Sequence, residues 1–298
     1  MGIFEVFGLG RKINTLPNDV KAAIESNIEI CERDCGSCTD PELEKDQAVF
    51  DKFKLDRETS LFGSSKVPSA NFIVPTSRMD WVHDACSEKK GSVQDCISKW
   101  VARHNDGKES SMQCNVSSLP LDIMDVEVLR GKKNTVLVLP HFIKLVGITS
   151  DNVDSILDEI APMLIEGDVD SLLKKDYIED CNESSFVFLC SHTTRDKRCG
   201  KSAPILRKHF NTNLQHHHLY REDSDFRRGG CRVAYINHVG GHKFAANVLI
   251  YLRKSRTLVW LGRVTPLHVK SIVDDLIVPE VPRLPNPENV RCVKKYDF

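Results

Sequence analysis

The pattern of apolar and polar positions divides the chain into a polar leader, two segments with strands and helices, and a proline-rich end. The first α/β segment covers residues 66–178. Its strands are expected in "NFIVPTS" and "TVLVLPHFIKLVG", and its helices in "SVQDCISKWVARH" and "NVDSILDEIAPMLI". Strands that alternate with such helical stretches predict a central sheet with helices packed on it.

The second α/β segment covers residues 179–278. Its expected strands and closing helix lie, in order, at residues 186–189, 232–236, 247–252, 257–261 and 267–276. A further helix follows the first strand, with Ile205, Leu206, Phe210 and Leu214 at helical spacing. Ser202 is its expected N-cap, and Pro204 fits its first turn. The predicted fold class is therefore α/β with two thioredoxin-like segments.

The two ends of the chain are predicted to lie outside these segments. Residues 1–65 are polar and interrupted, with one helix expected at residues 18–31. In residues 279–298, four prolines predict an extended tail that runs over the surface instead of another helix.

Composition narrows the class of protein and its compartment. The chain of 298 residues has 41% hydrophobic and 28% charged residues, enough for two domains with separate cores. Its net charge of -1 argues against nucleic acid or an anionic membrane as a partner. Eleven cysteines could form a disulfide framework, but the count is odd and the first residues lack the apolar core of a signal peptide. No apolar run is long enough to span a membrane, and we expect a reducing compartment.

Two motifs carry candidate metal chemistry. In "NHVGGHKF", His238 and His242 flank a glycine pair that is expected in a tight loop between two strands. Cys190 ends a buried strand, and Cys199 follows it across a polar, basic loop in a C-x8-C pattern. Histidines at such corners are otherwise mostly solvated or hydrogen-bonded, but two thiolates and two imidazoles together make a four-ligand set.

Three further clusters are weaker candidates. Cys31, Cys35 and Cys38 in "CERDCGSC" have no fourth ligand nearby, which favours exposed thiols over a zinc site. The histidines at 216–218 follow a helix end and favour a solvated cluster that compensates the helix dipole. In "DWVHDAC", the side chains of Trp81, His83 and Asp84 are candidates for lining a site. Trp81 fits the core equally well.

The motifs "CSHTTRDKRCG", "NHVGGHKFAANVLIYLR", "LVWLGRVTP", "VPTSRMDWVHDAC" and "LPLDIMDVEVLRG" closely resemble the sucrase/ferredoxin-like family. The resemblance spans almost the whole chain. It implies that the second segment is a thioredoxin-like ferredoxin that holds a [2Fe-2S] cluster. By position, it also implies the cluster's ligands, which are Cys190, Cys199, His238 and His242.

The resemblance further implies a one-electron carrier. Two neutral imidazoles in place of thiolates remove negative charge from the cluster, which makes reduction easier and allows it to be coupled to protonation. Arg195, Lys197, Arg198, Lys201 and Lys243 lie near the ligands in sequence. They either tune the potential and steer an anionic partner, or belong to a solvated loop.

The resemblance also bears on location and partners. The absent presequence is typical of the family's cytosolic branch, so we expect a cytoplasmic protein. The last two residues, Asp297 and Phe298, are similar to the acidic-aromatic signals that hand some cytosolic iron-sulfur proteins to the targeting machinery. The resemblance identifies neither the electron donor nor the acceptor.

Three alternatives stay open. A structural zinc site would use the same ligands, although C-x8-C is wider than the usual zinc knuckle. A thiol oxidoreductase fits the thioredoxin-like layout but lacks a C-x-x-C pair in the second segment. A scaffold protein in actin organisation, with a structural metal, is the alternative from the interaction class that the family resemblance suggests.

Overall fold

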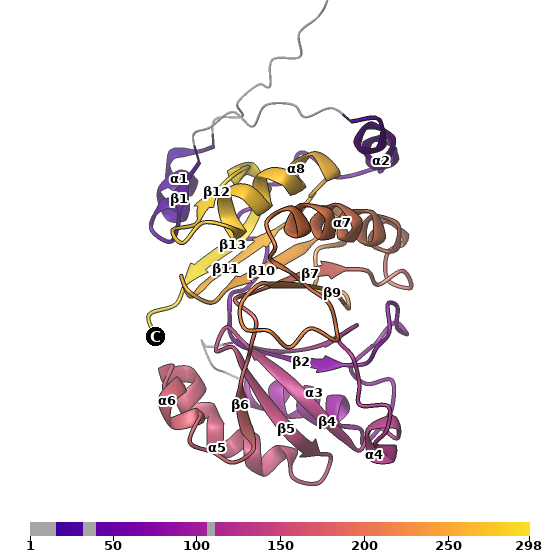
Figure 1. Cartoon of the computed structure of the whole chain (residues 1–298), viewed down its shortest axis with the longest axis vertical. Coiled ribbons are helices and arrows are strands. Elements are labelled where there is room, and N and C mark those ends of the chain that lie inside the picture. The colour runs from indigo at the N-terminus through magenta and orange to yellow at the C-terminus, as the bar shows by residue number, and fades with distance from the viewer. Residues whose placement is uncertain (1–15, 32–39, 106–110) are drawn as a thin grey trace, which may run out of the picture.

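The computed structural model describes residues 16–31, 40–105 and 111–298. Helix α1 (Asn18–Glu25), strand β1 (Glu29–Ile30) and helix α2 (Pro41–Asp51) lie on the outside of the C-terminal half (Figure 1). The predicted helix at 18–31 is therefore shorter, and α2 was not predicted. Asp40 caps α2, and Pro41 takes its first position.

The described residues of the N-terminal half form strands β2 to β6 and helices α3 to α6. Its strands are β2 (Pro68–Pro75), β3 (Ser111–Ser117), β4 (Lys133–Leu139), β5 (Ile143–Thr149) and β6 (Ile178–Asp180). Its helices are α3 (Val93–His104), α4 (Val126–Leu129), α5 (Val153–Glu166) and α6 (Val169–Leu172). The predicted strands and helices correspond to β2, α3, β4 with β5, and α5, whereas β3 and α4 were not predicted.

The C-terminal half follows the same plan of strands and covering helices. Its strands are β7 (Ser185–Cys190), β8 (Tyr220–Arg221), β9 (Cys231–Ile236), β10 (Val248–Leu252), β11 (Thr257–Leu261), β12 (Arg283–Leu284) and β13 (Val290–Lys295). Its helical segments are α7 (Lys197–His216), η1 (His242–Phe244), α8 (Pro266–Ser271), η2 (Ile272–Ile277) and η3 (Pro287–Asn289).

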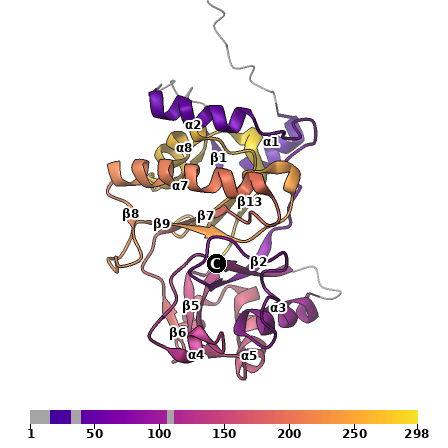
Figure 2. The ribbon, with the colours of Figure 1, turned by 90° about the vertical axis from the view of Figure 1, so that its right-hand side faces the viewer.

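One mixed sheet runs through both halves in the order β13-β11-β10-β7-β9-β3-β2-β4-β5-β6. The halves join where β3 pairs with β9, at Ser117 and Ile236. Helices cover the outer faces, α3 and α5 at one end of the molecule and α7 and α8 at the other (Figures 1 and 2). These features confirm the predicted α/β, thioredoxin-like fold class. The predicted boundaries at 65, 178 and 278 stay predictions.

The two halves also pack through the sheet faces that the helices leave uncovered. On β7, Val187 and Leu189 face one apolar cluster, whereas Phe186 and Phe188 face another that includes Ile73 of β2. This alternation of side chains is the period of two expected for a strand buried on both faces. None of the helices in the described part of the chain is long and apolar enough to cross a membrane.

Two predictions need correction, one for the C-terminal tail and one for the start of helix α7. The tail is extended, but β13 pairs with β11 and residues 290–293 are buried, so this part does not run over the surface. Helix α7 begins at Lys197 with Asp196 as its N-cap, not at Ser202. The Asp196 carboxylate accepts a hydrogen bond from the Arg198 amide at 2.9 Å, and the helix starts six residues earlier than the apolar spacing suggested.

Candidate functional site

The candidate site lies at the carboxyl ends of two neighbouring parallel strands. Cys190 is the last residue of β7 and pairs with Ile236, the last residue of β9. His238 follows two residues later, and Cys199 lies in the first turn of α7. Carboxyl ends of adjacent parallel strands are a common place for binding sites in α/β proteins.

The structure brings three of the four predicted ligands together. Cys190 and Cys199 are 1% and 0% exposed, and their side chains are hydrogen-bonded to each other. The His238 side chain is also hydrogen-bonded to Cys190. Two thiols and an imidazole in contact are donors that suit iron-sulfur clusters and zinc alike.

His242 begins η1, but its side chain lies outside the described part of the structure. Within the described residues, no group of three or more His, Cys, Asp or Glu side chains has an arrangement that could hold a metal ion. The assignment of the four ligands therefore stays a prediction.

Electrostatics distinguishes the two cysteines. The hydrogen bond from Cys199 and a second one from His238 lower the pKa of Cys190 to about 5, despite its burial. The same bond to Cys190, together with burial, raises the pKa of Cys199. Cys190 is therefore the more acidic of the two thiols, and a metal that bound both sulfurs would displace the proton of Cys199.

The glycine pair has the conformation that the sequence predicted. Gly240 and Gly241 join β9 to β10 with φ values of +85° and +70°, a region that favours glycine. A Cβ on Gly240 would meet nothing within 4 Å, so one side of the loop is open. A Cβ on Gly241 would lie 2.5 Å from Nη2 of Arg291, so this glycine makes room for an arginine.

His192 is a site residue that the sequence reasoning missed, although it stands in the quoted "CSHTTRDKRCG" motif. It is 1% exposed, and its Nε2 donates to the carbonyls of Trp81 and Val82 at 3.0 and 2.9 Å. Its Nδ1 accepts a hydrogen bond from the His238 amide at 3.1 Å. Burial lowers the pKa of His192, which keeps the ring neutral and able to accept this bond.

The "DWVHDAC" loop supports the site from the N-terminal half. Trp81 is buried, and its indole nitrogen donates to Thr76 Oγ1 at 3.0 Å, so it belongs to the core. His83 and Asp84 are exposed. The Ser191 hydroxyl donates to the Met79 carbonyl at 2.6 Å, which attaches this loop next to Cys190.

The basic residues near the ligands divide into two groups. Arg195 donates to the His83 carbonyl, and Arg198 pairs with Asp196 at 2.7 Å. The three lysines are exposed: Lys197, Lys201 and Lys243. The arginines therefore fix local structure. Lys243 lies 3.8 Å from Asp56, and Lys197 and Lys201 leave positive charge at the surface.

The remaining candidates do not join this site. Cys31 follows β1 and is half-buried, whereas Cys35 and Cys38 lie outside the described residues. His217 contacts Asp274 with 2.8 Å between Nε2 and Oδ1. Asp297 is exposed, and the half-buried Phe298 stacks on His141 with ring centroids 4.6 Å apart.

The model of the sucrase/ferredoxin-like family matches residues 61–292, so the chain belongs to this family. The chain is 49% identical to actin patches distal protein 1 of Saccharomyces cerevisiae, over 96% of each chain. It is also 44% identical to altered inheritance of mitochondria protein 32 of Clavispora lusitaniae, over 31% of this chain and 30% of the relative. No solved structure gives a significant match.

Proposed function

We propose that the chain is a cytosolic [2Fe-2S] protein that carries one electron, with Cys190, Cys199, His238 and His242 as the ligands. The observation that carries this proposal is the contact of the buried Cys190 with both Cys199 and His238, at the ends of two parallel strands. The family description, which includes ferredoxin, supports a redox use of these residues.

Each of the surrounding residues has a role in this proposal. A bound [2Fe-2S] cluster takes up and releases one electron. Cys190 is the more acidic thiol of the pair, and Cys199 gives up its proton on binding. His192 fixes the main chain at His238. Imidazole ligands can release a proton more readily when the cluster is oxidised, so we expect electron transfer to be coupled to protonation.

The proposal extends to partners. We propose that the cytosolic iron-sulfur targeting machinery recognises Asp297 and Phe298 when the cluster is inserted. The electron donor and acceptor would meet the face that exposes Lys197, Lys201 and Lys243, because exposed lysines attract an acidic partner surface.

The name of the Saccharomyces relative favours a second candidate, an interaction protein in actin organisation with a structural metal site. The two candidates are compatible if the electron carrier is linked to oxidant tolerance and actin patch organisation. They differ in one property, because only the first requires a protein that is reduced and reoxidised.

The test is the absorption spectrum, iron content and acid-labile sulfide of protein purified without oxygen. We expect a coloured protein with about two iron and two sulfide ions per chain. Cys190→Ser and Cys199→Ser should lose the cluster, because each removes a thiolate ligand. Two variants serve as controls and should keep it: Cys231→Ser, which alters a buried thiol at the opposite end of β9, and Cys31→Ser in the leader.

Stoichiometric zinc without sulfide would refute the proposal and favour the second candidate. Loss of the cluster in Cys231→Ser, with retention in Cys199→Ser, would mean that the wrong thiolates were assigned.

A further inference from the structure

Arg291 is a buried cation beside the candidate site. It lies in β13, is 1% exposed and is among the largest fully buried side chains of the described residues. Burial lowers the pKa of Arg291 to about 10, so its guanidinium stays charged at neutral pH. The charge lies above the rings of Trp260 and Phe244, at 4.9 and 5.2 Å from their centroids.

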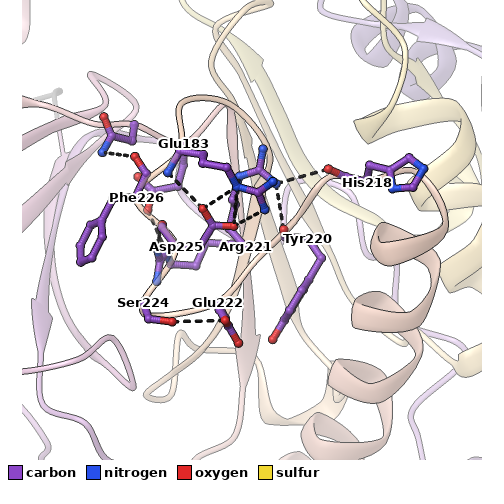
Figure 3. A network of polar contacts seen from close by, with 11 residues as sticks. Glu183, His218, Tyr220, Arg221, Glu222, Ser224, Asp225 and Phe226 are labelled. Atoms are coloured by element: carbon purple, nitrogen blue, oxygen red, sulfur yellow. Dashed lines mark hydrogen bonds and ion pairs between the residues drawn. The ribbon is translucent and has the colours of Figure 1, made fainter.

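No carboxylate among the described residues lies within ion-pair distance of Arg291. Its partners are neutral oxygens, from Ser64, Gly240 and Asn247. The other buried arginines differ in this respect. Arg232 contacts Glu183 at 2.8 Å, and Arg221 lies 3.8 Å from Asp225 in the network of Figure 3.

A buried charge without a counter-charge is costly, by several kcal/mol. The structure therefore calls for a negative group near Arg291. The two ionisable groups that influence its guanidinium are the sulfurs of Cys292 and Cys190. Burial raises the pKa of Cys292, which keeps that thiol neutral, and Cys190 is a predicted ligand.

Arg291 also connects the two chain segments that carry the predicted ligands. Its Nη1 donates to the Gly240 carbonyl at 3.0 Å, two residues after His238. The same nitrogen donates to Asn247 Oδ1 at 2.6 Å, and the Asn247 carbonyl accepts from the Cys190 amide at 3.1 Å. One guanidinium therefore supports both the histidine loop and the end of β7.

We propose that Arg291 positions the loop that carries His238 and supplies the buried positive charge that favours the reduced state of the site. The electrostatic part rests on the proposed function. Two ferric ions, two sulfides and two thiolates sum to zero charge, so reduction adds one negative charge near Arg291. A nearby cation stabilises that charge, and a low-dielectric interior strengthens the effect.

Two variants separate charge from positioning. Asn247→Asp places a carboxylate against Arg291 in the same shape, and the Asn247 amide nitrogen that it removes has no hydrogen-bond partner among the described residues. Arg291→Lys keeps the charge but cannot reproduce the several bonds of the guanidinium. As a control, Arg263→Gln removes another arginine over the Phe244 ring, one that donates to the Thr59 carbonyl instead of to the loop.

The electrostatic part is measured as the ratio of reduced to oxidised protein at a fixed ambient potential. We expect Asn247→Asp to lower this ratio at least tenfold, which is about 59 mV for one electron. Arg291→Lys and Arg263→Gln should change it less than about threefold. An unchanged ratio in Asn247→Asp, or an equal fall in Arg263→Gln, would overturn the electrostatic part.

Positioning is measured on metal-free protein, as the rate of proteolytic cleavage in residues 237–247. Arg291→Lys should raise this rate at least threefold, and Asn247→Asp should leave it unchanged. Equal rates in wild type and Arg291→Lys would overturn the positioning part. Because this assay needs no cluster, its outcome stands even if the wild-type protein has no acid-labile sulfide, the result that would refute the proposed function.

Discussion

His141 shows how a single buried ring makes stability depend on pH. It is 4% exposed, its Nε2 donates to the Leu164 carbonyl at 2.8 Å, and Phe298 stacks on it. Burial lowers the pKa of His141 to about 4, because the charged ring would lose its hydration. The unfolded chain accepts this proton near pH 6.5, and the folded protein accepts it only near pH 4.

Protonation of His141 therefore favours unfolding, and its penalty grows as pH falls from about 6.5 to 4. Through this ring the wild-type protein should lose up to roughly 3 kcal/mol of unfolding free energy across this window, and we expect His141→Gln not to show this loss. Urea unfolding of both proteins at pH 7 and pH 4.5 measures it. His83→Gln alters an exposed ring and is the control. Parallel pH curves for wild type and His141→Gln would contradict the assignment.

At the scale of single residues, the sequence indicated which candidate residues come together better than it indicated the residues that support them. Cys190, Cys199 and His238 stand in short motifs, and the structure places them in contact. His192 and Arg291 support the site through hydrogen bonds to the backbone of segments that are distant in the sequence, and the sequence alone does not show which segments come together.

At the scale of elements, the first turn of α7 positions Cys199. The Cys199 amide donates to the Asp196 carbonyl at 3.0 Å, while the Asp196 carboxylate caps the helix. Gly200 is needed in this turn, because a Cβ there would lie 2.0 Å from Thr193 Oγ1. The cap and the glycine together hold the C-x8-C loop against the helix.

We expect Asp196→Ala to lower the free energy of unfolding by about 1 kcal/mol, because an amide at the helix start loses its acceptor. Asp196→Asn keeps a capping oxygen and should lower the free energy of unfolding by only about a few tenths of a kcal/mol. Chemical denaturation followed by circular dichroism compares the two. A loss in Asp196→Asn as large as in Asp196→Ala would mean that the ion pair with Arg198, not the cap, stabilises this end.

Predictions of elements succeeded where the periodicity was strong. Helices α3 and α5 and strands β7 and β10 agree with prediction to within a residue or two at each end, because the helices follow a helical period and the strands are continuous apolar runs. Helix α2 has a mostly polar sequence, and only its Asp-Pro start could have indicated it. Strand β13 was missed because prolines before it suggested a surface tail, whereas pairing with β11 decides its position.

At the scale of the whole molecule, the end of the chain joins the two halves. Phe298 follows β13 of the C-terminal half, but its ring lies on His141 and against Gly167 of the N-terminal half. A Cβ on Gly167 would lie 2.2 Å from Phe298, so this glycine leaves the room that the ring occupies. Tyr296 adds a hydrogen bond from its hydroxyl to the Pro68 carbonyl at 2.7 Å.

We expect Phe298→Ala to lower the free energy of unfolding by about 1–3 kcal/mol, less than a fully buried phenylalanine, because the ring is half-buried. Asp297→Ala alters an exposed side chain and should leave it unchanged. Thermal unfolding of metal-free protein measures this effect apart from cluster delivery. If Phe298→Ala unfolds like wild type but has less iron when isolated from cells, the residue acts in delivery and not in stability.

The bonds from Arg291 to Ser64 also set an order of folding. These two residues are 227 positions apart in the sequence, and the same guanidinium holds the Gly240 carbonyl. Contacts between residues so far apart in the sequence form more slowly than local contacts. We infer that the strands pair first and that the loop of His238 gains its final shape only when β13 joins the sheet. The candidate site is then among the last parts of the molecule to form, and any ligand it binds can be held only by a chain that has folded from the leader to β13.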